Sequence, residues 1–127
     1  MKKKLLYTGG ILSLLFTCLH LLFPKMFDWQ HTLTCLAPAN RAVYLTLYLA
    51  TTFILTASVV ICFVMARQKG ISMAERIVLF MFAGFYIIRI IAGPLYFGVT
   101  KTEIIGWCVC LATSLCFIIP ALTKNER

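Results

Sequence analysis

The sequence predicts an all-α integral membrane protein: an antiparallel four-helix transmembrane bundle with an amphipathic segment between helices one and two. Hydrophobic residues make up 61% of the 127 residues, and the mean hydropathy is +0.94. A soluble domain is only about 45–50% apolar by a comparable count. The apolar residues gather in four runs, each close to the roughly 20 residues that a helix needs to cross a bilayer. We therefore expect a single transmembrane domain covering residues 1–127.

The first span is predicted at about residues 5–23, after the cationic start Met1–Lys4. A signal peptide is the main alternative for this run, but its apolar part has only about 7–15 residues. The one stretch that resembles a cleavage site, Ala37-Pro38-Ala39, lies far beyond the run. The sequence therefore favours an uncleaved transmembrane helix.

The connection at about residues 24–40 is predicted to be an interfacial amphipathic segment. Asp28 can cap a short helix, because aspartate is a preferred N-cap residue. Pro38 is expected to end the segment, and Asn40 to cap the second span. An apolar face at helical spacing is formed by Trp29, Leu33 and Leu36.

The remaining spans are predicted at about residues 41–66, 77–98 and 104–122. Two capping boxes, Ser72-x-x-Glu75 and Thr100-x-x-Glu103, precede the third and fourth spans. Gly98 is expected to end the third span.

The basic residues set the expected orientation. Eight lie on one side of the predicted membrane: Lys2, Lys3, Lys4, Arg67, Lys69, Arg76, Lys124 and Arg127. Three lie on the other: Lys25, Arg41 and Lys101. The positive-inside rule then places both termini in the cytoplasm, as expected for a multi-pass protein of the bacterial cytoplasmic (inner) membrane. Because these charges sit at the ends of apolar runs, the net charge of +8 indicates lipid headgroups, and nucleic acid is not expected as a partner.

Arg89 is the residue most indicative of function, because it is the only charge in the run 77–98. A central guanidinium costs about 2.5–3.5 kcal/mol on insertion scales, and such charges usually face a bundle interior or an aqueous cavity. Reaching a membrane surface is difficult from a position about nine or more residues from either end of the run. Pro94 is expected to free the carbonyl of Ile90 and to kink the helix there.

Polar residues on the other spans suggest an outward-facing pocket around Arg89. The ligand-binding candidates are Arg89, His20, Tyr44, Tyr48, Tyr86 and Tyr96. No carboxylate lies within a predicted span, so the countercharge of Arg89 is expected to be Asp28, if the outer segment dips inward, or Glu103. If neither acid reaches the guanidinium, we expect it to meet a carboxylate on a partner, water and hydroxyls, or a ligand.

Metal, cofactor and disulfide chemistry find little support in the sequence. His20, His31 and Cys35 offer a conceivable metal site, but no chelating motif of fixed spacing is present. Most of the six cysteines lie in apolar runs, where cysteine usually acts as a small hydrophobe. We therefore predict no metal, no cofactor and no catalytic residue, and the sequence favours a non-enzymatic protein.

The chain resembles a group of small uncharacterised four-span bacterial membrane proteins. The resemblance lies at His20, Phe23-Pro24, Phe27, Trp29, Asn40-Arg41 and Tyr86–Arg89. In size and hydropathy the chain is also similar to the DoxX-like group. These resemblances imply a four-span membrane fold and bring no activity, so no functional residue is transferred from them.

The first functional hypothesis is a ligand-binding or transport component that holds a small anionic or carbonyl-bearing ligand at Arg89. The second is an accessory or scaffold subunit of a larger membrane complex, in which Arg89 pairs with an acidic residue on a partner helix. Because so small a chain buries little surface alone, a homo-oligomer or a membrane partner protein is also expected. The third is a thiol-based membrane redox protein using Cys35 or the thiols of the fourth span.

Overall fold

The computed structural model describes residues 1–123, and every regular element within them is helical. The four long helices are α1 (Lys2–Met26), α3 (Pro38–Arg67), α4 (Met73–Tyr96) and α5 (Lys101–Leu122). Each is long and apolar enough to cross a membrane. The short helix α2 (Trp29–Thr32) and the 3₁₀ turn η1 (Leu33–Cys35) connect α1 to α3. The prediction of an all-helical chain with four apolar helices is confirmed. Two of the basic residues used to predict the orientation, Lys124 and Arg127, lie outside the described residues.

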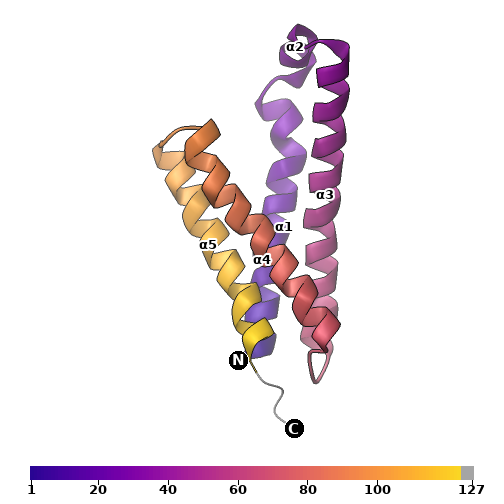
Figure 1. The fold of residues 1–127 in the computed structure, drawn as a ribbon, viewed down its shortest axis with the longest axis vertical. Helices are drawn as coiled ribbons and strands as arrows, with labels where there is room; N and C mark the ends of the chain where they lie inside the picture. Colours follow the sequence, from indigo (N-terminus) through magenta and orange to yellow (C-terminus); the bar gives the residue numbers. More distant parts are fainter. Residues whose placement is uncertain (124–127) are drawn as a thin grey trace.

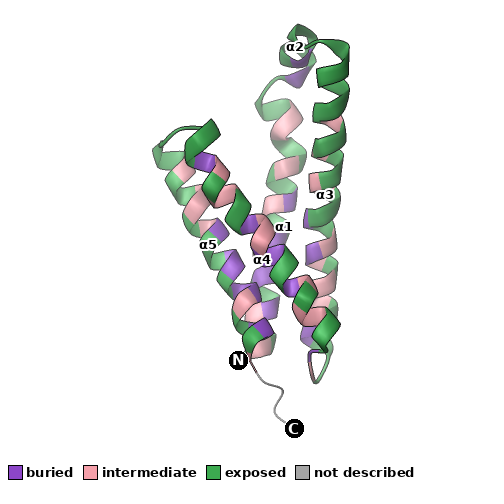
Figure 2. Ribbon diagram, viewed as in Figure 1, coloured by how far each residue is buried: buried purple, intermediate pink, exposed green. Residues whose placement is uncertain are grey.

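The long helices form two pairs. Helix α1 packs along α3, α4 packs along α5, and α1 also contacts α5. Figure 1 shows that the pairs meet near the chain termini and diverge toward α2. We call these two ends of the molecule the terminal end and the α2 end. Buried residues concentrate where the pairs meet, whereas much of α3 near the α2 end is exposed (Figure 2).

Two glycines allow α1 to approach both of its neighbours. A Cβ on Gly9 would lie 2.6 Å from Cε1 of Phe117 on α5, and a Cβ on Gly10 would lie 3.3 Å from Cβ of Cys62 on α3. Small residues of this kind allow two helix backbones to approach closely. Hydroxyl groups are buried in the same core, from Ser13, Thr17, Ser58, Thr113 and Ser114.

Helix α4 opens with the predicted capping box. The backbone N–H of Glu75 donates to Oγ of Ser72 at 3.3 Å, and the backbone N–H of Ser72 donates to Oε2 of Glu75 at 2.6 Å. Helix α5 keeps one of the two bonds, from the N–H of Glu103 to Oγ1 of Thr100 at 3.2 Å. The carboxylate of Glu103 is directed to α4 instead. Gly98 follows the end of α4 with a φ of 74°.

Of the two caps predicted for the connection at 24–40, the one at Asn40 is wrong, and the one at Asp28 is confirmed in position but lacks its side-chain bond. Helix α3 begins at Pro38 with Ala37 as its N-cap, so Asn40 lies inside the first turn. Proline suits that first position, because an N–H there would have no partner within the helix. Asp28 does precede α2, but its carboxylate makes no cap bond. It contacts Nδ1 of His31 at 2.8 Å instead.

Candidate functional site

The guanidinium of Arg89 pairs with the carboxylate of Glu103 in the first turn of α5. Nη2 of Arg89 donates to Oε2 at 2.9 Å and to Oε1 at 3.2 Å. Of the two acids considered as its countercharge, Glu103 is thus the one in contact. The other, Asp28, lies beyond the end of α1 and pairs with His31, with both side chains mostly exposed. The positive charge of Arg89 is therefore matched within the chain.

The side chain of Arg89 reaches toward the connection between α4 and α5. Its Cζ lies 4.8 Å from the ring centroid of Phe97, the C-cap residue of α4. Phe97 is eight residues beyond Arg89, or about 12 Å along a helix, and the two side chains together span that distance. The expectation that Arg89 lies too deep to reach a membrane surface stays a prediction.

Two buried N–H donors lie beside Gly93, and no described protein atom accepts a hydrogen bond from either. They are Nη1 of Arg89 and Nε1 of Trp107. A Cβ on Gly93 would lie 2.9 Å from Nη1 of Arg89 and would overlap the indole of Trp107. The missing side chain at position 93 therefore allows the two donors to converge. An unpaired buried donor costs roughly 1–3 kcal/mol, so an acceptor atom in reach of either nitrogen would stabilise the arrangement.

We call this cluster the Arg89 site; it consists of Arg89, Gly93, Phe97, Glu103 and Trp107. Its ion pair is only partly buried, since the side chain of Arg89 is 39% exposed and that of Glu103 is 19% exposed. The site therefore combines a neutral ion pair, two unpaired donors and two aromatic rings at one end of the α4–α5 pair. Such a set of groups can hold an oxygen acceptor next to an apolar body.

Tyr86 and Tyr96, the other candidates on α4, lie in opposite environments. The side chain of Tyr86 is buried, and its hydroxyl donates to Oγ of Ser13 on α1 at 2.9 Å. Its ring also packs against Phe16 of α1 and Phe117 of α5. Tyr86 therefore joins the two helix pairs inside the core. Tyr96 is 81% exposed at the end of α4.

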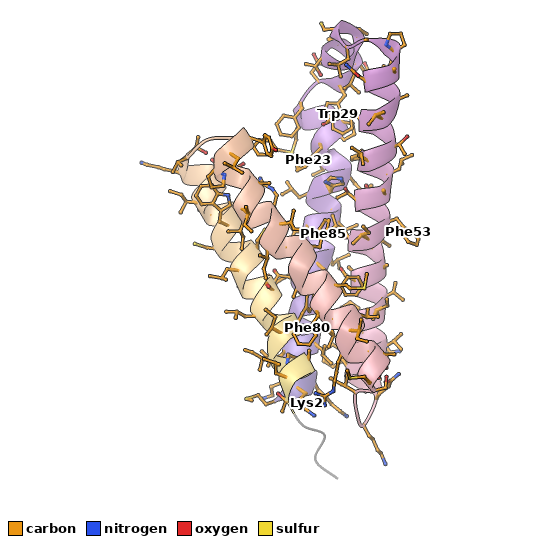
Figure 3. All side chains as sticks on the ribbon, in the orientation of Figure 1. Lys2, Phe23, Trp29, Phe53, Phe80 and Phe85 are labelled. Carbon is orange, nitrogen blue, oxygen red and sulfur yellow. The ribbon has the colours of Figure 1, made fainter. Side chains whose placement is uncertain are left out.

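His20, Tyr44 and Tyr48 belong to a separate aromatic cluster on α1, α2 and α3. The ring of His20 stacks on Tyr48 at a centroid distance of 4.8 Å, and the hydroxyl of Tyr48 donates to the carbonyl of His20 at 3.3 Å. Trp29 packs edge-on against both Tyr44 and Tyr48, and Figure 3 shows it between α2 and α3. This cluster attaches α2 to α3, and the contacts described here do not join it to the Arg89 site.

Sequence reasoning did not single out Phe97 and Trp107 as site residues. For Trp107, the residue spacing gave an indication: Trp107 follows Glu103 by four residues, just as Gly93 follows Arg89 by four. Residues four apart share one face of a helix. Because α4 runs toward its connection with α5 and α5 runs away from it (Figure 1), Gly93 and Trp107 both fall between Arg89 and Glu103 along the helix pair. Whether Gly93 and Trp107 meet depends on how the two helices are rotated, which the spacing does not show.

Other features of the structure do not add to the Arg89 site. Among residues 1–123, no group of three or more His, Cys, Asp or Glu side chains is placed to hold a metal ion. All six cysteines are free, with Cys62, Cys110 and Cys116 buried. Two surface hollows, of about 300 and 370 Å³, lie between α3 and α4 and beside η1 and the start of α3.

No protein-family model matches this chain, and comparisons with the curated proteins and with the solved structures give no match. Its function is therefore inferred from the chemistry of its own residues.

Proposed function

We propose that the protein is a non-enzymatic ligand-binding or transport component of a membrane, and that the Arg89 site binds an oxygen atom of its ligand. The observation that carries this proposal is the pair of buried, unpaired donors on Arg89 and Trp107. Both nitrogens lie within 2.9 Å of the point where a Cβ on Gly93 would stand. A carbonyl or an oxyanion has lone pairs for two such bonds.

The surroundings of the donors support binding. Because Glu103 accepts both of its bonds from Nη2 of Arg89, it holds one nitrogen of the guanidinium and leaves Nη1 without a partner among the described residues. Donors held in place before binding lose less entropy when the ligand arrives. Phe97 and Trp107 offer aromatic surface to the apolar part of a small amphiphile.

The membrane arrangement is part of the proposal. We place the four long helices as antiparallel spans of a bacterial cytoplasmic membrane, with both termini cytoplasmic. The count of eight basic residues against three supports this orientation. The Arg89 site then lies toward the outer surface. A reporter enzyme that is active only in the cytoplasm, fused to the C-terminus, should be active; an inactive but well-expressed fusion would reverse the orientation.

The ion pair favours a binding component over an accessory subunit. The accessory-subunit hypothesis assumed that Arg89 needs an acidic residue on a partner helix. Glu103 supplies that acid from the same chain, so the charge of Arg89 gives no reason to invoke a partner. The redox hypothesis gains no support from the Arg89 site, which contains no cysteine.

The binding test uses the indole N–H of Trp107 as a local reporter. The chain has two tryptophans, so protein labelled with ¹⁵N-tryptophan gives two indole signals, and Trp29→Phe assigns them. The protein, in a maltoside detergent, is titrated with a diacylglycerol, a long-chain alkyl phosphate and an alkane. We expect a saturable shift of the Trp107 signal with an oxygen-bearing probe, no shift with the alkane and an unmoved Trp29 signal.

Arg89→Lys is the matched variant for this titration. Lysine keeps a positive charge for Glu103 but has no second nitrogen for the ligand. Because a hydrogen bond that involves a charged group contributes about 1.5–3 kcal/mol, binding should weaken by about tenfold or more. If no probe gives a saturable shift of Trp107, or if Arg89→Lys binds as tightly as the wild type, the proposed function is wrong.

A further inference from the structure

We infer that the Arg89 site selects an uncharged carbonyl oxygen over an anion, so that its ligand is a neutral, carbonyl-bearing amphiphile. This inference rests on the proposed function, which leaves both kinds of oxygen open. It follows from the charges around the two unpaired donors.

The first argument is the charge balance at the donors. The guanidinium of Arg89 already holds the carboxylate of Glu103 at 2.9 Å. An anion placed at Nη1 of the same guanidinium would lie only a few ångströms farther from that carboxylate than from the arginine. Repulsion by Glu103 would then offset much of the attraction by Arg89, in a setting where the anion also loses its hydration.

The second argument is that no neighbouring cation on α5 restores a positive balance. The basic residue nearest to Glu103 in the sequence is Lys101, which is exposed at the start of α5. Residues two apart do not face each other on a helix, so Lys101 and Glu103 point in different directions. The described ion pairs of Arg89 include only Glu103.

The third argument is the match between a carbonyl and the donors. A carbonyl oxygen carries no net charge, so it loses less hydration than an anion when it is buried. Its two lone pairs can accept one bond from Nη1 of Arg89 and one from Nε1 of Trp107. The rings of Phe97 and Trp107 can contact the apolar groups that flank the carbonyl.

Within a membrane, this chemistry has two sources: the ester group of a glycerolipid and the ring carbonyl of a quinone. The site offers the same contacts to both, and separate arms of the experiment distinguish them. An ether-linked lipid has the same shape as its ester counterpart but lacks the carbonyl, so it is the matched control for the first arm.

The experiment compares four probes through the Trp107 indole signal in a maltoside detergent, which has no carbonyl of its own. The probes are a diacylglycerol, the dialkyl ether of equal chain length, a short-chain benzoquinone and an alkyl phosphate. We expect the diacylglycerol or the quinone to bind at least tenfold more tightly than the ether and the phosphate. The stronger of these two arms identifies the source of the carbonyl.

Glu103→Gln provides the matched variant, because it removes the negative charge and keeps the size of the side chain. We expect its affinity for the alkyl phosphate to rise at least tenfold, while its affinity for the carbonyl probe changes much less. An unmoved Trp29 signal shows that the variant is folded. If it does not fold, the four-probe comparison in the wild-type protein decides by itself.

Two outcomes would overturn the inference and leave the proposed function standing: tighter binding of the phosphate than of both carbonyl probes by the wild type, or binding of the ether that is as tight as that of both carbonyl probes. If none of the four probes shifts Trp107, both the inference and the proposed function fail.

Discussion

The substitution Gly93→Ala tests the geometry of the Arg89 site directly. The added Cβ would lie 2.9 Å from Nη1 of Arg89 and from Cε2 of Trp107, and it would overlap the indole nitrogen. To accommodate it, the indole has to move away from α4 or the guanidinium has to shift. Gly84→Ala is the matched control on the same helix, since a Cβ there meets no atom within 4 Å.

The expected magnitudes follow from two opposing contributions. Alanine is better than glycine inside a helix by about 1 kcal/mol, and both variants receive this gain. Overpacking a well-filled site costs about 1–3 kcal/mol, and only Gly93→Ala bears this cost. Gly84→Ala should therefore be as stable as the wild type or slightly more stable. Gly93→Ala should be less stable than Gly84→Ala by about 1–3 kcal/mol.

The assay is reversible unfolding in detergent, followed by circular dichroism, for the wild type and both variants. The Trp107 indole signal is recorded alongside; it should move in Gly93→Ala and stay in place in Gly84→Ala. Equal stabilities of the two variants, together with an unmoved indole signal in Gly93→Ala, would refute the close approach of α5 to Gly93.

Two further substitution sets test the ion pair and the core. Arg89→Leu and Glu103→Leu should each destabilise the protein by about 1–3 kcal/mol, because each leaves a partly buried charge without its partner. The double variant should lose less than the sum of the two, and simple additivity in unfolding experiments would argue against the pair. Tyr86→Phe removes the hydroxyl that donates to Ser13 and should cost about 0.6–1.5 kcal/mol. Tyr96→Phe, at an 81% exposed position, should leave the unfolding midpoint unchanged, and equal effects at the two tyrosines would contradict the buried bond.

Local sequence patterns predicted the helices and several of their ends, because these depend on neighbouring residues. The capping box at Ser72 and Glu75 forms as expected, since both partners lie within one turn. The cap expected at Asn40 does not form. Pro38 can itself occupy the first helical position, so α3 starts earlier and Asn40 falls inside the helix.

The candidate site was only partly accessible from the sequence. Arg89 stood out because a charge in an apolar run is costly, and the small number of acids left few candidates for its countercharge. We predicted that His20, Tyr44 and Tyr48 line a pocket with Arg89, because each lies on a polar face of its own helix. Spacing within a helix shows which residues share such a face. It does not show which helix that face meets. In the structure, His20 packs on Tyr48, and both tyrosines pack against Trp29.

The sequence by itself was sufficient to predict four apolar helices and to show that one of them contains a charged residue, Arg89. Hydropathy and helical periodicity are properties of short stretches of chain, so no tertiary contact is needed to read them. The tertiary structure alone decided that the guanidinium of Arg89 meets Glu103 and Phe97, and that it shares the space beside Gly93 with Trp107. Those contacts depend on how α4 and α5 are rotated and how closely they approach, and packing between distant residues sets both.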